Sequence, residues 1–410
     1  MAVQTANPST TSKSRQWTRR TFVTAATAAT AAAAWTITGC SSSKLAMLKS
    51  KKAGVYKCPF GTTPGGKAVE MYSITNGNGL VAQFITYGAR LVRLGAPDKK
   101  GQIGDVLLGY STLAPYIHHN TDPYFGATIG RYANRIARGT FTLNGKTYHI
   151  PLNDGTSTLH GGPHAFDEQV WTATEYQEPG GFGVRFQYFS PNMQNGFPGN
   201  LLTTATYVLT ENNELHIRFR CNTDQATVVN ICNHGYWNLA GPGKKILDHV
   251  LELNADHYTP VNTMLIPTGQ IAPVAGTPYG FRKPVRLGSR IKPFPAKSKA
   301  NFDQYPYGYD TNFCLNGQSG KMAFAARVSE PTTGRVMEVY TTQPGIQIYT
   351  ANFLDGTLDG IGGKYPKHGA VTFETQHYPN SPNQPNFPST VLNPMPAYYY
   401  QRTIHKFRTM

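Results

Sequence analysis

A single carboxylate, Glu374, lies near the end of a strand-like apolar run, just before a segment that two prolines interrupt. The stretch reads V-T-F-E-T-Q-H-Y-P-N-S-P-N-Q from Val371 to Gln384, so that Gln376 and His377 follow the carboxylate closely. A glutamate can serve as a general base, and a histidine as a general acid. An isolated glutamate at a strand end, however, is usually a solvated polar residue. A catalytic interpretation of Glu374 therefore needs partner groups elsewhere in the chain.

Four other stretches combine charged or hydrogen-bonding side chains with turn residues, where strands end and sites are usually built. They are G-R-Y-A-N-R-I-A-R-G (130–139), S-T-L-H-G-G-P-H (157–164), N-I-C-N-H-G-Y-W-N-L (230–239) and Y-G-Y-D-T-N-F (307–313). Each has a purely structural explanation when taken alone; His160, for example, could be a turn histidine bonded to its own backbone. Together with Glu374 they offer a His and Glu acid–base pair among polar and aromatic groups suited to a sugar.

Other chemistries find less support. Glu374 and Asp310 could be the two carboxylates of a glycosidase. The sequence has no G-x-S-x-G elbow of a serine hydrolase, no phosphate-binding P-loop and no dinucleotide fingerprint. His118 and His119 are adjacent and would point to opposite faces of a strand, which does not suit a zinc site. We therefore expect no metal and no organic cofactor.

The elements that position these groups have a period of two residues. In Glu214 to Cys221, E-L-H-I-R-F-R-C, apolar and polar side chains alternate, as in a half-buried strand. Asn144-Gly145 splits residues 140–150 into a hairpin, because this dipeptide supplies the positive φ of a two-residue turn. The sequence after about residue 55 shows no convincing amphipathic helix and no fixed repeat. It predicts an all-β protein, a sandwich or a barrel.

Composition describes a globular, loop-rich chain of 410 residues, 40% hydrophobic and 15% charged, with 41 Gly and 29 Pro. The net charge of +16 becomes +12 for a chain starting at Cys40, because four of the 38 cations and no acid precede that residue. The cations are scattered and no nucleic-acid-binding motif is present, so we expect no nucleic acid partner. The densest basic stretch, Phe281 to Lys299, is expected to be a solvated connecting loop, with contact to an anionic envelope surface as the alternative.

The N-terminus has the pattern of an export signal over residues 1–39. A basic segment, Thr18 to Val23, precedes an apolar Ala-rich run that is too short to span a membrane comfortably. The pair Arg19-Arg20 resembles a twin-arginine signal, and I-T-G-C resembles a lipoprotein box with Cys40 as the lipidated residue. We expect an exported protein of the periplasm or cell envelope, anchored only by a lipid on Cys40 and followed by a polar tether over 40–55. Cleavage after the Ala run, with a soluble product, is the alternative.

Cysteine usage fits export of an already folded chain. Cys58, Cys221, Cys232 and Cys314 form no C-x-x-C pair. Cys221 and Cys232 lie on neighbouring predicted strands and could pair after export. Buried free thiols are the preferred interpretation.

The five polar stretches, in this order, resemble the aldose 1-epimerase (galactose mutarotase) family. The family pattern contains G-R-x-A-N-R-I, L-H-G-G, N-H-x-Y-[FW]-N, Y-D-x-N-F and F-E-T-Q-H-Y-P-like segments, and the segment L-I-P-T-G-Q-I-A-P-V-A-G-T-P-Y-G-F-R-K-P (265–284) also resembles it. The resemblance covers roughly residues 66 to 407. It implies a large antiparallel β-sandwich, the galactose mutarotase-like supersandwich, forming one catalytic domain over residues 56–410.

The resemblance also implies roles for individual residues. Glu374 would be the general base and His234 the general acid. The sugar-binding positions implied are Asn134, Arg135, His160, Tyr236, Asp310 and Gln347. Thr311 departs from the family, in which a His often follows the Asp, and this affects the expected substrate preference. The proline-rich stretch from Lys292 to Pro306 resembles an insertion that could reshape the rim of the site.

The implied activity is interconversion of the α and β anomers of free aldohexoses of the glucose and galactose type, by opening and reclosing the sugar ring. At pH 7 an ordinary Glu is ionised and an ordinary His is about a quarter protonated. The free aldose would be the small-molecule partner, and the protein a monomer or weak homodimer. Three alternatives stay open: a non-catalytic exported sugar-binding protein, an epimerase for a hexose phosphate, and the glycosidase.

Overall fold

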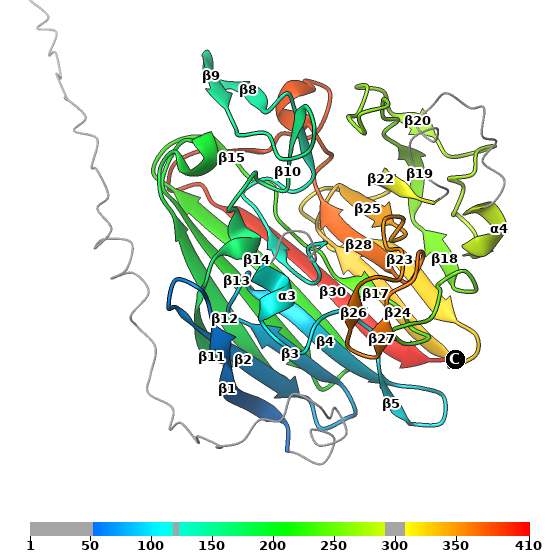
Figure 1. Cartoon of the computed structure of the whole chain (residues 1–410). Helices are drawn as coiled ribbons and strands as arrows, with labels where there is room; N and C mark the ends of the chain where they lie inside the picture. The colour runs from blue at the N-terminus through cyan, green and yellow to red at the C-terminus, as the bar shows by residue number, and fades with distance from the viewer. Residues whose placement is uncertain (1–51, 118–122, 292–307) are drawn as a thin grey trace, which may run out of the picture. The chain divides into compact units, whose positions relative to one another are not determined.

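The computed structural model of this chain describes residues 52–117, 123–291 and 308–410, all of which belong to one compact unit. The predicted signal over 1–39, Cys40 and most of the tether lie outside the described residues. So do His118, His119 and the stretch from Lys292 to Pro306. Strands dominate what is described (Figure 1).

The largest sheet has nine antiparallel strands. In spatial order they are β11 (Thr172–Glu178), β12 (Gly181–Ser190), β13 (Leu201–Thr210), β14 (Glu214–Thr223), β30 (Tyr399–Thr409), β24 (Arg335–Thr341), β23 (Ala323–Glu330), β18 (Val250–Leu253) and β21 (Val285–Arg286). In β14 the residues Leu215, Ile217, Phe219 and Cys221 are buried and Arg220 is exposed, as the alternating pattern predicts.

Two further sheets pack against this one. A five-stranded sheet contains β1 (Gly54–Thr62), β2 (Ala68–Thr75), β3 (Val81–Ile85), β4 (Arg90–Pro97) and β5 (Ile103–Asp105). A six-stranded sheet has the order β17 (Tyr236–Trp237), β28 (Val371–Gln376), β25 (Gly345–Tyr349), β22 (Asp310–Leu315), β19 (Ala255–Tyr258) and β20 (Ala272–Pro273). One hydrophobic core joins all three sheets, with Phe84, Phe186, Phe313, Met337 and Phe373 among its members. The predicted antiparallel sandwich is confirmed.

Five short ribbons and a few single turns complete the regular structure that the described ranges contain. The ribbons pair β10 (Ser157–Leu159) with β7 (Arg135–Ala137), β15 (Thr227–Val228) with β29 (Val391–Leu392), β16 (Cys232–Asn233) with β6 (Thr128–Ile129), β26 (Asp359–Gly360) with β27 (Gly363–Lys364), and β8 (Thr140–Leu143) with β9 (Lys146–His149). The turns are α3 (Ala114–Ile117), α4 (Gly288–Ile291), and the 3-10 turns η1 (Phe166–Glu168), η2 (Gln194–Gly196) and η3 (Ser381–Asn383). The β8–β9 hairpin turns at Asn144 (φ 51°) and Gly145 (φ 76°), as predicted. In the described part of the chain, no helix is long and apolar enough to cross a membrane.

Two boundaries differ from the sequence-based expectation. β1 begins at Gly54, so the last two residues of the expected tether already pair with β2. The basic stretch from Phe281 is not simply a solvated loop, because β21 joins the nine-stranded sheet and α4 follows it. Phe281, Leu287 and Ile291 are buried in the core and fix the segment, while Arg282, Lys283 and Arg286 are exposed. The rest of that stretch lies outside the described residues.

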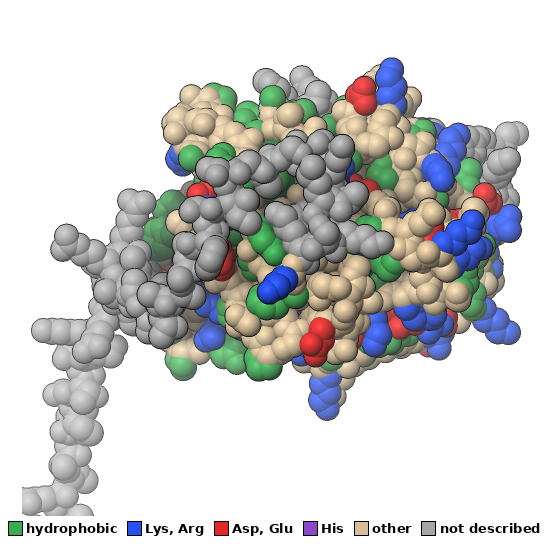
Figure 2. Space-filling model, turned by 90° about the horizontal axis from the view of Figure 1, so that it is seen from below, with side chains coloured by type: hydrophobic (Ala, Val, Ile, Leu, Met, Phe, Trp, Pro, Cys, Tyr) green, Lys and Arg blue, Asp and Glu red, His purple; other side chains and the backbone are tan. Residues whose placement is uncertain are grey.

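The thiols follow the expectation of burial, and charges of both signs lie on the surface (Figure 2). On the face drawn in Figure 2, Lys and Arg side chains gather mostly toward one side, with Asp and Glu side chains among them. Some of the charged side chains are paired on the nine-stranded sheet, as Arg327 and Arg408 are with Glu338. Cys58, Cys221, Cys232 and Cys314 are all buried free thiols, so Cys221 and Cys232 do not pair.

Candidate active site

Three adjacent strands of the six-stranded sheet carry one half of the candidate site. Glu374 on β28 pairs with Gln347 on β25, and Asp310 on β22 pairs with Tyr349 on β25. Because successive residues of a strand face opposite sides, these four side chains share the outer face of the sheet. The inner face of β28 turns toward β30, where the Thr375 and Thr403 hydroxyls lie 2.6 Å apart.

Turns between short ribbons carry the other half. Asn134 precedes β7, His160 follows β10, and Leu159 pairs with Arg135 between these two strands. His234 lies between β16 and β17. Because β17 pairs with β28, this turn brings His234 beside Glu374. Gly161 allows the His160 turn to approach this closely. Its φ is +92°, and a Cβ there would lie 2.3 Å from the carbonyl oxygen of Gly130.

These elements enclose a cavity of about 160 Å³, which has room for about one pyranose ring. Its walls contain seven of the eight residues implied by the sequence: Asn134, Arg135, His160, His234, Tyr236, Asp310 and Glu374. The eighth, Gln347, lies directly behind them and donates a 2.6 Å hydrogen bond from its amide to Asp310. The structure thus brings together groups that are up to 240 residues apart in the sequence.

Glu374 is held at both carboxylate oxygens although its side chain is only 2% exposed. The Thr372 hydroxyl donates to Oε1 at 2.9 Å, and the Cys232 thiol lies 3.9 Å from Oε2. Nε2 of His234 lies 3.4 Å from Oε1. Glu374 is therefore an oriented, buried carboxyl group beside an imidazole, not a solvated strand end.

Burial reverses the protonation states expected from reference pKa values. Loss of water raises the pKa of Glu374 to about 8 and lowers the pKa of His234 to about 3, because both charged forms lose solvation. Both shifts favour the uncharged forms, the opposite of the ionised Glu and partly protonated His that reference pKa values give. At neutral pH the pair carries one proton, and this proton resides on Glu374.

His160 presents a defined ring nitrogen to the cavity. Its Nδ1 accepts a 3.2 Å hydrogen bond from the backbone N–H of Asn134, so a neutral His160 carries its proton on Nε2. Burial, followed by the nearby His234 and Arg135, holds the pKa of His160 well below its usual value. The ring packs against Tyr124 with centroids 4.6 Å apart and against His234 at 5.0 Å. His160 is thus suited to donate a hydrogen bond to a sugar oxygen.

Another part of the cavity wall carries charged side chains, one of which is held in an ion pair. Arg135 donates from Nε to Asp154 at 2.6 Å, while its backbone N–H is held by the Asn134 side chain at 2.8 Å. Burial raises the pKa of Asp310, with Arg135 opposing the shift. A fixed guanidinium and two carboxyl groups give a site with both donors and acceptors for hydroxyl groups.

The same cluster has the spacing that a metal ion would also need. One ligand atom from each of His160, His234 and Glu374 lies within 4.8 Å of the other two. The proton transfer expected of Glu374 and His234 would require no metal. We expect prolonged dialysis against EDTA to leave the activity implied by the family resemblance unchanged within twofold. A loss of tenfold or more that added Zn²⁺ restores would contradict a purely acid–base site.

Sequence reasoning missed several residues of this site. Thr372, Cys232 and Tyr349 each stand two positions from an implied residue on the same strand or turn, so strand alternation is a signal that could have found them. Tyr124 and Phe353 come from loops, which carry no such signal. Thr311 is buried on the other face of β22 and does not line the cavity, so this departure from the family pattern does not contact a ligand there.

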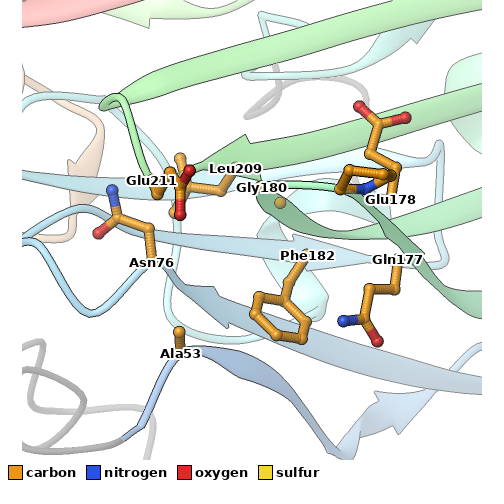
Figure 3. Close-up of a pocket in the computed structure, with 10 residues that line it drawn as sticks. Ala53, Asn76, Gln177, Glu178, Gly180, Phe182, Leu209 and Glu211 are labelled. Atoms are coloured by element: carbon orange, nitrogen blue, oxygen red, sulfur yellow. The ribbon is translucent and has the colours of Figure 1, made fainter.

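A larger cavity, of about 580 Å³, lies between the start of β1 and the turn joining β11 to β12 (Figure 3). Asn76, Phe182 and Glu211 line it, and no histidine of the described ranges does. The Glu178 carboxylate at its edge is paired with Arg218. This cavity has no acid–base pair, so size alone does not mark the reactive site.

Comparison with known proteins decides the family. The sequence pattern of the family described as "Aldose 1-epimerase" matches residues 70–402. The galactose mutarotase of Sus scrofa is 44% identical over 347 residues, which are 84% of this chain and 96% of that protein. The chain belongs to the aldose 1-epimerase family. The aldose 1-epimerase of Escherichia coli (strain K12) is 33% identical over 325 residues, 79% of this chain and 91% of that protein.

Solved structures agree with this membership in the aldose 1-epimerase family. The crystal structure of galactose 1-epimerase from Lactobacillus acidophilus NCFM has a TM-score of 0.75 and 27% sequence identity. The match covers 87% of this chain and 99% of that one.

Proposed function

We propose that this protein is an aldose 1-epimerase that interconverts the α and β anomers of free aldohexoses, with Glu374 and His234 exchanging protons with the sugar. The observation that carries the proposal is the 3.4 Å pairing of these two buried groups on the wall of a cavity for one sugar ring. The pKa of Glu374 is raised and that of His234 is lowered. Neighbouring groups whose pKa values are shifted in different directions are typical of acid–base sites. The names of the relatives support the same reaction.

Ring opening needs one acid and one base at the same time. The base takes the proton of the anomeric hydroxyl, the bond between C1 and the ring oxygen breaks, and the acid protonates the ring oxygen. Rotation about the C1–C2 bond and reclosure then give the other anomer, with the two groups exchanging roles. Glu374 acts as base and His234 as acid in the opening step, and the pair therefore needs one proton in total.

The opposed shifts favour both transfers once the pair is in its ionic form. A carboxylate whose pKa is about 8 is a stronger base than an ordinary one, and an imidazolium whose pKa is about 3 is a stronger acid. After ring opening, Glu374 holds the proton that came from the anomeric hydroxyl, and His234 is neutral. Burial favours this arrangement, in which neither side chain is charged. Each positioned transfer typically contributes about 10²–10⁴-fold to the rate.

The pH dependence of kcat/KM follows from this single shared proton. As pH rises through about 8, the free enzyme's Glu374 loses its proton and the pair has no acid left. A second proton is added only near pH 3, the lowered pKa of His234. We expect kcat/KM, corrected for the buffer reaction, to be flat from pH 5 to 7 and to fall about tenfold per unit well above pH 8. A rising limb between pH 4 and 6 would instead show that Glu374 must ionise with an ordinary pKa.

Free sugars suit this cavity better than sugar phosphates. Asp310 and Glu374 place two carboxyl groups in the walls, and Arg135 is already paired with Asp154. NMR saturation transfer between the α and β anomeric protons at equilibrium would test this preference. We expect enzyme-dependent exchange with glucose or galactose and at least tenfold less with glucose 6-phosphate. Faster exchange with the phosphate, or none with either free sugar, would contradict the proposal.

We also propose that the chain is exported by the twin-arginine signal at Arg19-Arg20 and anchored by a lipid on Cys40. The basic segment, the apolar run and the I-T-G-C box of the sequence support this. The mass of the membrane-extracted protein tests it. An N-terminal diacylglyceryl-cysteine peptide starting at Cys40 is expected, whereas an unmodified Cys40 peptide from a soluble fraction would refute the anchor.

A further inference from the structure

A second cavity, of about 220 Å³, lies beside the start of β30 and shares no lining residue with the active site. The residues of its wall that bear on a ligand are Ser319, Thr342, Gln343, His377, Tyr398 and Tyr400. They come from the ends of β24, β28 and β30 and from the loops beside them. Neither the proposed reaction nor the core accounts for this combination of side chains.

The wall of this second cavity is uncharged. Among the residues that the structure describes, no Asp, Glu, Lys or Arg lines it. Burial lowers the pKa of His377 to about 4, so its imidazole is neutral near pH 7. The residues that line the cavity offer a charged ligand no counter-charge, and the Arg220 guanidinium beside them packs against the Tyr398 ring. The lining itself therefore suits a neutral ligand.

Several hydrogen-bonding groups of the wall are unused within the described residues. His377 Nδ1 and Gln343 Oε1 lie 2.9 Å apart, which fixes the Gln343 side chain. The Gln343 amide nitrogen and the hydroxyl groups of Ser319, Tyr398 and Tyr400 form no hydrogen bond in the described part of the chain. A ligand that carries several hydroxyl groups would match them.

Aromatic rings add an apolar surface to these polar groups. Tyr398 and Tyr400 are 55% and 48% exposed. With Val391 and Met395 they make four of the eleven large hydrophobic side chains that are exposed in the described ranges, all within ten residues of sequence. The Arg220 guanidinium lies 4.6 Å from the centre of the Tyr398 ring and holds it in place. Because the Tyr398 ring is already held by this contact, it loses little conformational entropy when a ligand binds.

We propose that this cavity is a second carbohydrate-binding site, which holds a neutral sugar unit of an oligosaccharide. A pyranose presents an apolar C–H face to a tyrosine ring and hydroxyl groups to amides and hydroxyls, and this wall offers both. It contains no acid–base pair, so it binds without catalysing. The inference does not depend on the proposed function, because it uses none of the catalytic residues.

Calorimetric titration with borohydride-reduced oligosaccharides tests this site. The probes are reduced maltoheptaose, cellohexaose and β-1,4-galactohexaose, which lack a reducing end and so cannot be epimerised. The protein is compared with a Tyr398→Ala/Tyr400→Ala double variant and a Tyr398→Phe/Tyr400→Phe variant. Tyr56→Ala, on β1, is the matched control, and the mutarotation rate of each variant checks its folding.

We expect at least one probe to bind, with affinity weakened at least tenfold in the double Ala variant and less in the Phe variant, which keeps both rings. The Tyr56→Ala control should bind like the parent protein, and mutarotation should be unchanged in all variants. The proposal is overturned if no probe binds, if binding survives the double Ala change, or if Arg135→Ala abolishes it. Preferential binding of an acidic polysaccharide such as polygalacturonate would equally overturn it.

Discussion

Glu374→Gln is expected to lower kcat for anomer exchange by about 10³–10⁴-fold while sugar binding persists. The amide keeps the shape of the side chain and its contact with the Thr372 hydroxyl, but it cannot take the anomeric proton. Coupled assay of β-anomer formation measures kcat, and calorimetry measures sugar affinity. Glu211→Gln, an exposed carboxylate in the larger cavity, is the matched control and should leave kcat unchanged.

The same variant should be more stable than the parent protein at alkaline pH. The folded-state pKa of Glu374, about 8, lies above its ordinary value of 4.5. The native state therefore holds this proton from about pH 4.5 to pH 8 while the unfolded state has lost it, so the free energy of unfolding falls as pH rises through that range. Each pH unit between the two pKa values lowers the free energy of unfolding by roughly 1.4 kcal/mol. We expect the Glu374→Gln variant to have a higher Tm than the parent at pH 9 and an equal Tm at pH 4.5; equal Tm values at both would contradict the burial argument.

His234→Asn is expected to lower kcat by about 10²–10³-fold with a smaller change in KM. Asparagine retains a polar group near Glu374 but cannot donate a proton to the ring oxygen. The position is buried, with His234 contacting His160 and Tyr236, so circular dichroism must accompany the kinetics. His257→Asn, at an exposed position of β19, is the matched control. A residual rate within fivefold of the parent would remove His234 from the acid role.

Sequence alone predicts strands well here because burial is encoded locally. Alternation over Glu214–Cys221 predicts β14, and Asn144-Gly145 predicts a turn, since both depend on neighbouring residues only. The pairing of β17, β28, β25 and β22 is different, because these strands are joined by long connections. The register that places Asp310 diagonally from Glu374 across β25 therefore came from the structure.

Most of the residues named from the sequence lie on the cavity, whereas their burial could not be predicted. The five polar stretches contain all of the implied residues except Gln347, and the structure places seven on one cavity wall and Gln347 behind it. Reference pKa values assume solvent, and the sequence does not reveal that Glu374 and His234 are both buried, so it gave no sign that burial raises the pKa of Glu374 and lowers that of His234. The basic stretch from Phe281 also contains three core side chains, and the sequence does not reveal that they are buried.

The most direct test of the central claim is polarimetry on freshly dissolved α-D-glucose and α-D-galactose, with the purified protein, its Glu374→Gln variant and buffer alone. Spontaneous mutarotation in buffer sets the baseline. A saturable acceleration by the protein that disappears in the Gln variant is the predicted result. If the protein and the variant both follow the buffer curve while still binding the sugars, the site is a sugar-binding site without catalysis, and the acid–base account of Glu374 and His234 is wrong.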